Sequence, residues 1–232
     1  MRIALISDVH GNFDALKAVM EDIKKLKIDK VYCLGDIVNY YYEPHKCINI
    51  FIKKKIKSIK GNHENIFFET LKNNKKRDHY SKIYGRSIDV NFKKLKKNHI
   101  VFLKKLKEKL TIKIKNLKII LAHGSPWSAN TYVYPNFKRK IKKALVKYNA
   151  DYIFLGHTHI PMNIKINRKT SIINPGSVGQ PRNKCNNACW ATFDTVNREI
   201  NFIETKYKKK KLIQNINKYE GLNSKLKKYF LN

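Results

Sequence analysis

The amino-acid sequence predicts an α/β domain with a mixed sheet, and three of its features lead to this fold class. Short apolar runs rich in β-branched residues each end abruptly in Gly, Asp, Asn or His, which is typical of buried strands. Segments with apolar residues at spacings of three and four lie between the early runs and predict amphipathic helices. Two turn sequences between strand-like segments predict hairpins, which add antiparallel strands.

The predicted elements alternate along the first part of the chain as strand, helix and strand, which favours a largely parallel inner sheet. Strands are predicted at Ile3–Ser7, Val31–Leu34, Ile56–Lys60, Ile119–Ala122, Tyr152–Leu155 and Ser171–Ile173. Helices are predicted at Asp14–Lys27, His45–Lys55 and Lys138–Tyr148. Hairpins are predicted at Lys113–Leu117 and Ile164–Ile172, so we expect the sheet to be mixed.

The length and composition favour a single large domain. A chain of 232 residues, 42% of them hydrophobic, can bury a sizeable core, and it has no Gly/Ser-rich or Pro-rich linker. We expect one domain over residues 1–232. Residues 64–110 are predicted to form a basic helical cap insert. Residues 206–232 are predicted to form a basic tail with an amphipathic C-terminal helix that ends in Leu226, Tyr229 and Phe230.

The sequence contains no candidate for a membrane span or a signal peptide. No apolar run approaches the ~18 residues that a span requires, and the N-terminal apolar stretch runs straight into charged residues. We therefore expect a cytoplasmic protein. The cysteines do not form a disulfide scaffold in a chain of this size. Cys33 lies in an apolar run and is expected in the core, while the spacing of Cys185 and Cys189 disfavours structural zinc.

The net charge is strongly positive, with 50 Lys and Arg against 17 Asp and Glu, giving +33. Such a charge attracts anionic partners, including nucleic acid, nucleotides and phosphorylated substrates. The excess of Lys, together with abundant Asn, Ile, Tyr and Phe, is also what an AT-rich genome would produce on a solvated surface. The scarcity of Glu argues against composition bias alone, so both explanations stay open.

Polar side chains gather where the predicted strands end. Open α/β sheets place their binding sites at the carboxyl ends of the strands, because those ends border a crevice. The set contains two carboxylates, one amide and five imidazoles, which are the side-chain types that bind metal ions. These groups belong to Asp8, His10, Asp36, Asn62, His63, His123, His157 and His159. The other three histidines lie in predicted helices or loops and are interpreted as structural.

The order of these groups resembles the motifs of the calcineurin-like metallophosphoesterases. The matching motifs are Asp8-x-His10, Gly35-Asp36, Gly61-Asn62-His63-Glu64, His123-Gly124 and Gly156-His157-Thr158-His159. Each motif is weak alone, but five in this order are specific. Further segments, among them the run from Asn174 to Arg182, resemble the small single-domain prokaryotic branch of that superfamily. The resemblance implies a layered αββα sandwich of mixed sheets flanked by helices.

The resemblance also implies a dinuclear metal centre. It places Asp8, His10, Asp36 and His159 on one ion, and Asp36, Asn62, His123 and His157 on the other, with Asp36 as the bridge. Two ions ~3.5–4 Å apart lower the pKa of bound water and neutralise the oxygens of a phosphoester. Mixed imidazole, carboxylate and amide ligands suit manganese, iron, zinc, nickel or cobalt, and the ligand set does not choose among them. We expect manganese, with the other four as alternatives.

His63, by resemblance, faces the substrate and either protonates the leaving oxygen or stabilises its charge. We expect Glu64 to hydrogen-bond this imidazole and keep it cationic; a carboxylate at the start of a helix is the alternative interpretation. Arg182 is a candidate phosphate contact, although a surface role is equally consistent with the sequence. The stretch after Asp36 lacks the Arg of protein Ser/Thr phosphatases, and Tyr40 and Tyr42 there could narrow the mouth or offer a stacking surface.

The leading functional hypothesis is therefore dinuclear-metal-dependent hydrolysis of a small or nucleotide-like phosphoester, as a phosphodiesterase or phosphatase. The alternative is a nuclease or RNA-end phosphodiesterase that holds nucleic acid on its basic surface. A binding scaffold without activity is disfavoured, because every ligand position of the motifs is kept.

Overall fold

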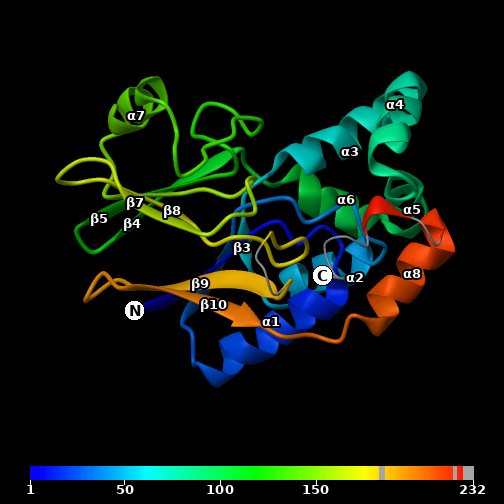
Figure 1. Ribbon diagram of the computed structural model, residues 1–232, viewed down its shortest axis with the longest axis horizontal. Coiled ribbons are helices and arrows are strands. Elements are labelled where there is room, and N and C mark those ends of the chain that lie inside the picture. Colours follow the sequence, from blue (N-terminus) through cyan, green and yellow to red (C-terminus); the bar gives the residue numbers. More distant parts are fainter. Residues whose placement is uncertain (183–185, 222–223, 227–232) are drawn as a thin grey trace.

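The computed structural model describes residues 1–182, 186–221 and 224–226, and its strands form two mixed five-stranded sheets (Figure 1). The first sheet has the order β10-β9-β1-β2-β3. Strands β1, β2 and β3 are parallel, β9 is antiparallel to β1, and β10 is antiparallel to β9. Its strands are β1 (Arg2–Ile6), β2 (Lys30–Cys33), β3 (Lys57–Ser58), β9 (Ala188–Asp194) and β10 (Ile200–Thr205). Three of these match predicted strands, whereas β9 and β10 were not predicted.

The second sheet has the order β4-β5-β6-β8-β7. Its strands are β4 (Lys109–Ile114), β5 (Leu117–Ala122), β6 (Tyr152–Phe154), β7 (Met162–Lys165) and β8 (Ser171–Asn174). Strands β5, β6 and β8 are parallel, and the antiparallel pairs β4–β5 and β7–β8 are the two predicted hairpins. Both hairpin predictions are therefore confirmed.

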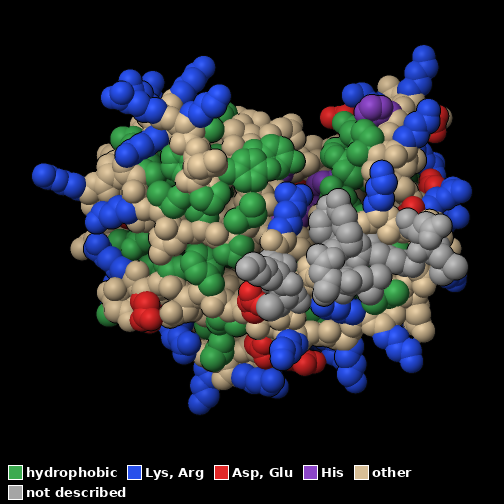
Figure 2. All heavy atoms as spheres, in the orientation of Figure 1, with side chains coloured by type: hydrophobic (Ala, Val, Ile, Leu, Met, Phe, Trp, Pro, Cys, Tyr) green, Lys and Arg blue, Asp and Glu red, His purple; other side chains and the backbone are tan. Residues whose placement is uncertain are grey.

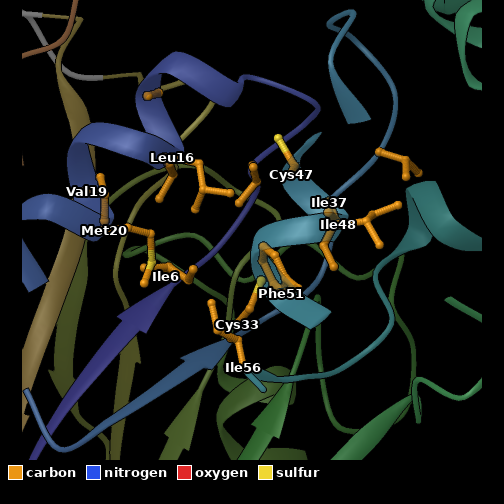
Figure 3. Close-up of a cluster of buried hydrophobic side chains, with 14 of the residues drawn as sticks. Ile6, Leu16, Val19, Met20, Cys33, Ile37, Cys47, Ile48, Phe51 and Ile56 are labelled. Carbon is orange, nitrogen blue, oxygen red and sulfur yellow. The ribbon is translucent and has the colours of Figure 1, made fainter. Parts of the chain in front are cut away.

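The two sheets pack face to face around a shared apolar layer, in which side chains such as Leu5 and Leu34 meet Leu121 and Phe154. Helices α1 (Phe13–Lys25) and α2 (Pro44–Lys53) pack on the outer side of the first sheet, where Leu16 and Phe51 join the core (Figure 3). Helix α7 (Arg139–Val146) packs on the outer side of the second. This layering confirms the αββα sandwich that the motifs implied.

Four helices follow β3 and precede β4 in the sequence, and they lie at one side of the sandwich (Figure 1). They are α3 (Asn62–Lys72), α4 (Asn74–Tyr84), α5 (Ser87–Lys94) and α6 (Lys97–Lys104). They occupy most of the segment for which a helical cap was predicted. Its last residues differ from the prediction: Lys109 and Leu110 already belong to β4, because pairing with β5 completes the second sheet.

Helix α8 (Lys210–Glu220) follows β10 and packs against the cap helices. The ring of Tyr219 stacks on that of Tyr42 with 4.5 Å between centroids, and Glu220 accepts hydrogen bonds from the Tyr42 hydroxyl and the Arg86 N–H. The predicted continuation of the tail helix to Tyr229 and Phe230 lies outside the described residues, as does Cys185. In the described part of the chain, no helix is long and apolar enough to cross a membrane.

Candidate metal centre

The predicted ligands come together where the parallel strands of both sheets end. Asp8 and His10 follow β1, Asp36 follows β2, and Asn62 starts the helix after β3. From the facing sheet, His123 follows β5, and His157 and His159 follow β6. All seven side chains are buried, with at most 7% of each residue exposed. The crevice between the two sheets thus collects the residues that the sequence placed at one rim.

One cluster of ligand atoms belongs to Asp8, His10 and His159, whose donor atoms all lie within 4.8 Å of one another. The Nε2 atom of His159 is 3.1 Å from Asp8 Oδ1 and 3.2 Å from His10 Nε2. Close approach of two imidazole nitrogens and one carboxylate oxygen is the arrangement that a shared divalent cation stabilises.

A second cluster contains Asp36, His123 and His157, again within 4.8 Å. The His123 Nε2 atom lies 3.1 Å from Asp36 Oδ2 and 3.0 Å from Asn62 Oδ1, so the amide oxygen joins this cluster. Asp36 Oδ2 is also 3.8 Å from His10 Nε2, which belongs to the first cluster. Asp36 therefore faces both clusters, as a bridging ligand must.

The second oxygen of each carboxylate is held by the backbone. The N–H of His63 donates to Asp36 Oδ1 at 2.8 Å, and that of His157 donates to Asp8 Oδ2 at 3.2 Å. One oxygen of each aspartate is thereby fixed, and the other turns toward the imidazoles.

Three of the imidazoles are oriented by hydrogen bonds from Nδ1 to backbone carbonyls. A carbonyl oxygen only accepts, so each Nδ1 carries a proton and each Nε2 turns to the centre, where it could bind a cation. The donors His10, His123 and His159 contact the carbonyls of Val38 at 3.2 Å, Leu34 at 2.6 Å and Gln180 at 2.8 Å, respectively.

Two buried polar atoms show that these residues suit metal ions, because neither atom has a hydrogen-bond partner in the described part of the chain. Among the residues that the structure describes, Asp8 Oδ1 and His157 Nε2 are buried without a hydrogen-bond partner, which is costly unless something else satisfies them. A divalent cation in each cluster would do so. Burial would lower the pKa of His123, but the charge of Asp36 and their hydrogen bond raise it to about 10. A proton therefore sits in the position that a cation would take.

The backbone is strained at the ligands. Asp8, His10, Asp36, His157 and His159 all have φ between 49° and 66°, in the left-handed region that costs about 1 kcal/mol or more for residues other than Gly. Gly61 has a different reason to be glycine: a Cβ at this position would collide with Asp36 Oδ1. Such strain is typical of a site that a surrounding fold holds in place.

The protonation of His63 is determined by Asn39, which the sequence did not single out. The Asn39 side-chain nitrogen lies 3.0 Å from His63 Nδ1 and also donates to the His63 carbonyl at 3.2 Å, so the amide orientation is determined. An amide nitrogen only donates, so His63 Nδ1 accepts and the neutral ring carries its proton on Nε2. Asn91 of α5 donates to Asn39 Oδ1 and completes this relay. Burial lowers the pKa of His63 to about 4, despite the opposing charge of Asp36.

Glu64 occupies a different place from the one predicted. Its carboxylate accepts the N–H groups of Asp36 at 2.9 Å, Ile37 at 2.7 Å and Gly61 at 2.7 Å. The expected hydrogen bond from Glu64 to the imidazole of His63 is therefore wrong. Glu64 is the third residue of α3, so its side chain folds back onto the start of the helix and clamps the loop that carries Asp36.

Aromatic side chains and one arginine border the centre. The Tyr132 ring lies 3.9 Å from the ring of His157, and the Tyr84 ring lies 4.8 Å from that of His63. Arg182 is exposed and donates to the Thr158 carbonyl at 3.3 Å. The sequence did not single out either tyrosine, because isolated tyrosines in a loop and on a helix carry no motif.

Comparison with known proteins places the chain in a family. Residues 1–198 match the model of the calcineurin-like phosphoesterase superfamily domain. An uncharacterized protein of Methanocaldococcus jannaschii is 33% identical over 236 residues, covering 92% of this chain and 91% of the relative. A metallophosphoesterase structure from Sphaerobacter thermophilus is 27% identical with a TM-score of 0.77, covering 97% of both chains. A hypothetical protein of Pyrococcus horikoshii shares the fold, at 24% identity and a TM-score of 0.85, over 98% of this chain and 96% of that one. This chain belongs to the calcineurin-like phosphoesterase superfamily.

Proposed function

We propose that this protein hydrolyses small or nucleotide-like phosphoesters with two divalent metal ions, as a phosphodiesterase or phosphatase. The observation that carries the proposal is the pair of buried ligand clusters that share Asp36 Oδ2. A lone structural ion would need only one of them. Two clusters side by side at the ends of parallel strands support a dinuclear centre.

The residues divide between the ions according to the distances. Asp8, His10 and His159 would hold one ion, and His123, His157 and Asn62 the other, with Asp36 between them. When bound, such ions activate water and neutralise phosphate oxygens. The mixed ligands are compatible with manganese, iron, zinc, nickel and cobalt alike, and we propose manganese as the metal to test first.

His63 would act as a neutral hydrogen-bond donor rather than as a ligand or a proton donor. Asn39 donates to Nδ1, so the proton stays on Nε2, and a protonated nitrogen does not bind a metal ion. A cationic ring would need a proton on Nδ1, directly against the Asn39 amide hydrogens. His63 Nε2–H would therefore stabilise charge on a phosphate oxygen in the transition state. Both roles that the sequence left open act on the leaving oxygen; we propose instead that this neutral donor contacts a non-bridging phosphate oxygen.

Arg182 would provide a further contact for the phosphoester. Its guanidinium reaches the carbonyl of Thr158, the residue between the two histidines of the last motif. From there it can offer further N–H donors to a phosphate oxygen. Many Lys and Arg side chains lie around the outline of the visible face, and some lie within it, one of them beside a histidine (Figure 2).

The test is metal reconstitution combined with a substrate pair. Chelator-treated protein is loaded with Mn²⁺, and its metal content is compared with hydrolysis of bis-p-nitrophenyl phosphate and p-nitrophenyl phosphate. We expect two ions per chain and metal-dependent release of nitrophenol. The variant Asp36→Asn should lose both ions and the activity, whereas Asp78→Asn, on helix α4, is the matched control that keeps both. Full activity with one ion per chain would refute the dinuclear centre.

A further inference from the structure

Two exposed tyrosines lie next to each other beside the metal centre, in the loop between β5 and α7. Tyr132 is 47% exposed and Tyr134 is 37% exposed, and their rings are parallel within 5° at 5.5 Å between centroids. The Tyr132 ring also lies 3.9 Å from that of His157, at 30°. A row of aromatic rings thus begins at a proposed metal ligand and continues through two partly exposed tyrosines. We call Tyr132 and Tyr134 the tyrosine platform.

The platform is held in place by the residue between its two rings. Val133 is only 1% exposed and packs in the core under the second sheet, in the same cluster as Leu145 of α7. Burial of Val133 between two outward-facing neighbours anchors the loop. The exposed tyrosines are therefore positioned side chains and not the free tips of a surface loop.

A second aromatic group faces the centre from the cap. Tyr84, at the end of α4, contacts His63 with 4.8 Å between ring centroids and Tyr80 with 6.1 Å. Burial raises the pKa of both Tyr84 and Tyr132, and the charge of Asp36 adds to each. Both hydroxyls thus lie in the field of one carboxylate. Figure 2 correspondingly shows a histidine between two groups of hydrophobic side chains, over the β5–α7 loop and over the cap.

Aromatic walls around a metal centre select for a planar partner. Nucleobases stack favourably on exposed aromatic side chains, because every base has a π-face. The first ring of the platform contacts a proposed ligand, and the second ring stacks on the first. A group that stacks on Tyr134 while its phosphate lies at the centre must therefore be joined to that phosphate by a spacer. The pentose of a nucleoside is such a spacer, whereas an aryl group bonded directly to the ester oxygen has none.

We propose that the tyrosine platform binds the base of a nucleoside phosphodiester whose phosphate lies at the metal centre. This inference rests on the proposed hydrolytic function. In the reaction, the oxygen of water forms a new bond to phosphorus and the bond from phosphorus to the leaving oxygen breaks. The leaving oxygen takes up a proton, and the products are a nucleoside monophosphate and an alcohol.

The experiment keeps the leaving group constant and varies the group that remains on phosphorus. Four p-nitrophenyl diesters are compared in the Mn²⁺-loaded protein: the 5′-ester of thymidine, the same ester of abasic deoxyribose, the phenyl ester and the methyl ester. We expect kcat/KM for the thymidine ester to exceed that for the abasic ester by about tenfold or more. The phenyl ester should resemble the methyl ester.

Variants then assign the preference to the platform. Tyr134→Leu should bring the thymidine-to-abasic ratio close to one, and Tyr134→Phe should restore it, because the phenyl ring still stacks. Trp127→Leu is the matched control: Trp127 is 44% exposed in the same loop, but stacks on Tyr148 away from the centre. Saturation-transfer NMR with thymidine 5′-monophosphate gives a second readout, with transfer to the base protons in the parent protein and its loss in Tyr134→Leu.

The outcomes separate this inference from the function on which it rests. If no ester is hydrolysed in a metal-dependent way, the proposed function fails. If the methyl ester is hydrolysed but the parent protein has a thymidine-to-abasic ratio near one, the platform proposal is overturned and the function stands. A ratio unchanged in Tyr134→Leu, or a phenyl ester as good as the thymidine ester, overturns it as well.

Discussion

Replacing His63 separates two chemical roles that a histidine beside a phosphoester can perform. The relay from Asn91 through Asn39 places the proton of the neutral ring on Nε2, and burial lowers the pKa of His63 to about 4. Near pH 7 the ring then offers a hydrogen bond but no proton to transfer. We therefore predict that His63→Ala slows hydrolysis by the same factor for every leaving group.

The magnitude follows from the kind of interaction that is lost. A hydrogen bond to a charged oxygen contributes ~1.5–3 kcal/mol, which corresponds to about 10- to 160-fold in kcat/KM. A general acid would contribute ~10²–10⁴-fold, and its contribution would grow with the basicity of the leaving oxygen. The dependence on the leaving group therefore discriminates better than the size of the effect.

The assay is a series of methyl aryl phosphodiesters whose phenols span several pKa units, measured with parent and variant proteins at equal metal content. In a plot of log kcat/KM against the pKa of the phenol, His63→Ala should give a parallel line about 1–2 units lower. His63→Gln should recover part of the loss, because its amide can donate a hydrogen bond but cannot act as an acid. A steeper line for His63→Ala, with no recovery by Gln, would refute the neutral-donor role.

Three further predictions concern groups around the centre. Asn39→Asp should favour a proton on Nδ1 of His63 and raise its pKa, so the NMR titration of this ring should move to higher pH; an unchanged titration would contradict the relay. Glu64→Gln should lower the free energy of unfolding in urea by ~1–3 kcal/mol, because an amide cannot accept all the backbone N–H groups that the carboxylate accepts; Glu69→Gln, on the exposed side of α3, is the control. Metal binding near pH 7 should release a proton, because His123 has a pKa of about 10 before an ion binds. The affinity for the metal ion should therefore rise with pH up to about that pKa. Calorimetry in buffers of different ionisation enthalpy measures the proton release.

The ligands of the candidate centre could be found from the sequence because each one lies within a few residues after a short apolar run. Asp36 after β2 and His123 after β5 are examples. Strand ends are easy to locate, and parallel strands bring their carboxyl ends to one edge. The left-handed backbone of Asp8 and His157 could not be predicted, since neither residue type demands it and only the surrounding fold imposes it.

The edge of the first sheet was missed for a physical reason. β9 is buried along six of its seven residues, but its apolar residues are Ala, Cys, Trp and Phe, so it lacks the run of β-branched apolar residues that predicted the other strands. β10 alternates only weakly, because Phe202 is 42% exposed at the edge. These two strands leave little periodic signal, and only their pairing identifies them: β9 pairs antiparallel with β1, and β10 pairs antiparallel with β9.

The error at Glu64 shows how an adjacent residue can mislead. Glu64 follows His63 directly, but side chains one apart on a helix do not face each other. Because His63 and Glu64 sit in the first turn of α3, the glutamate turns back to the loop of Asp36 while the histidine meets Asn39. The partner of the histidine thus comes from the loop after β2, and that partner is held in turn by the cap. Asn91 belongs to α5, so the position of a cap helix, and not a neighbouring carboxylate, determines which nitrogen of His63 carries the proton. A change that displaces α5 should consequently alter the chemistry of His63 while leaving the seven proposed ligands in place.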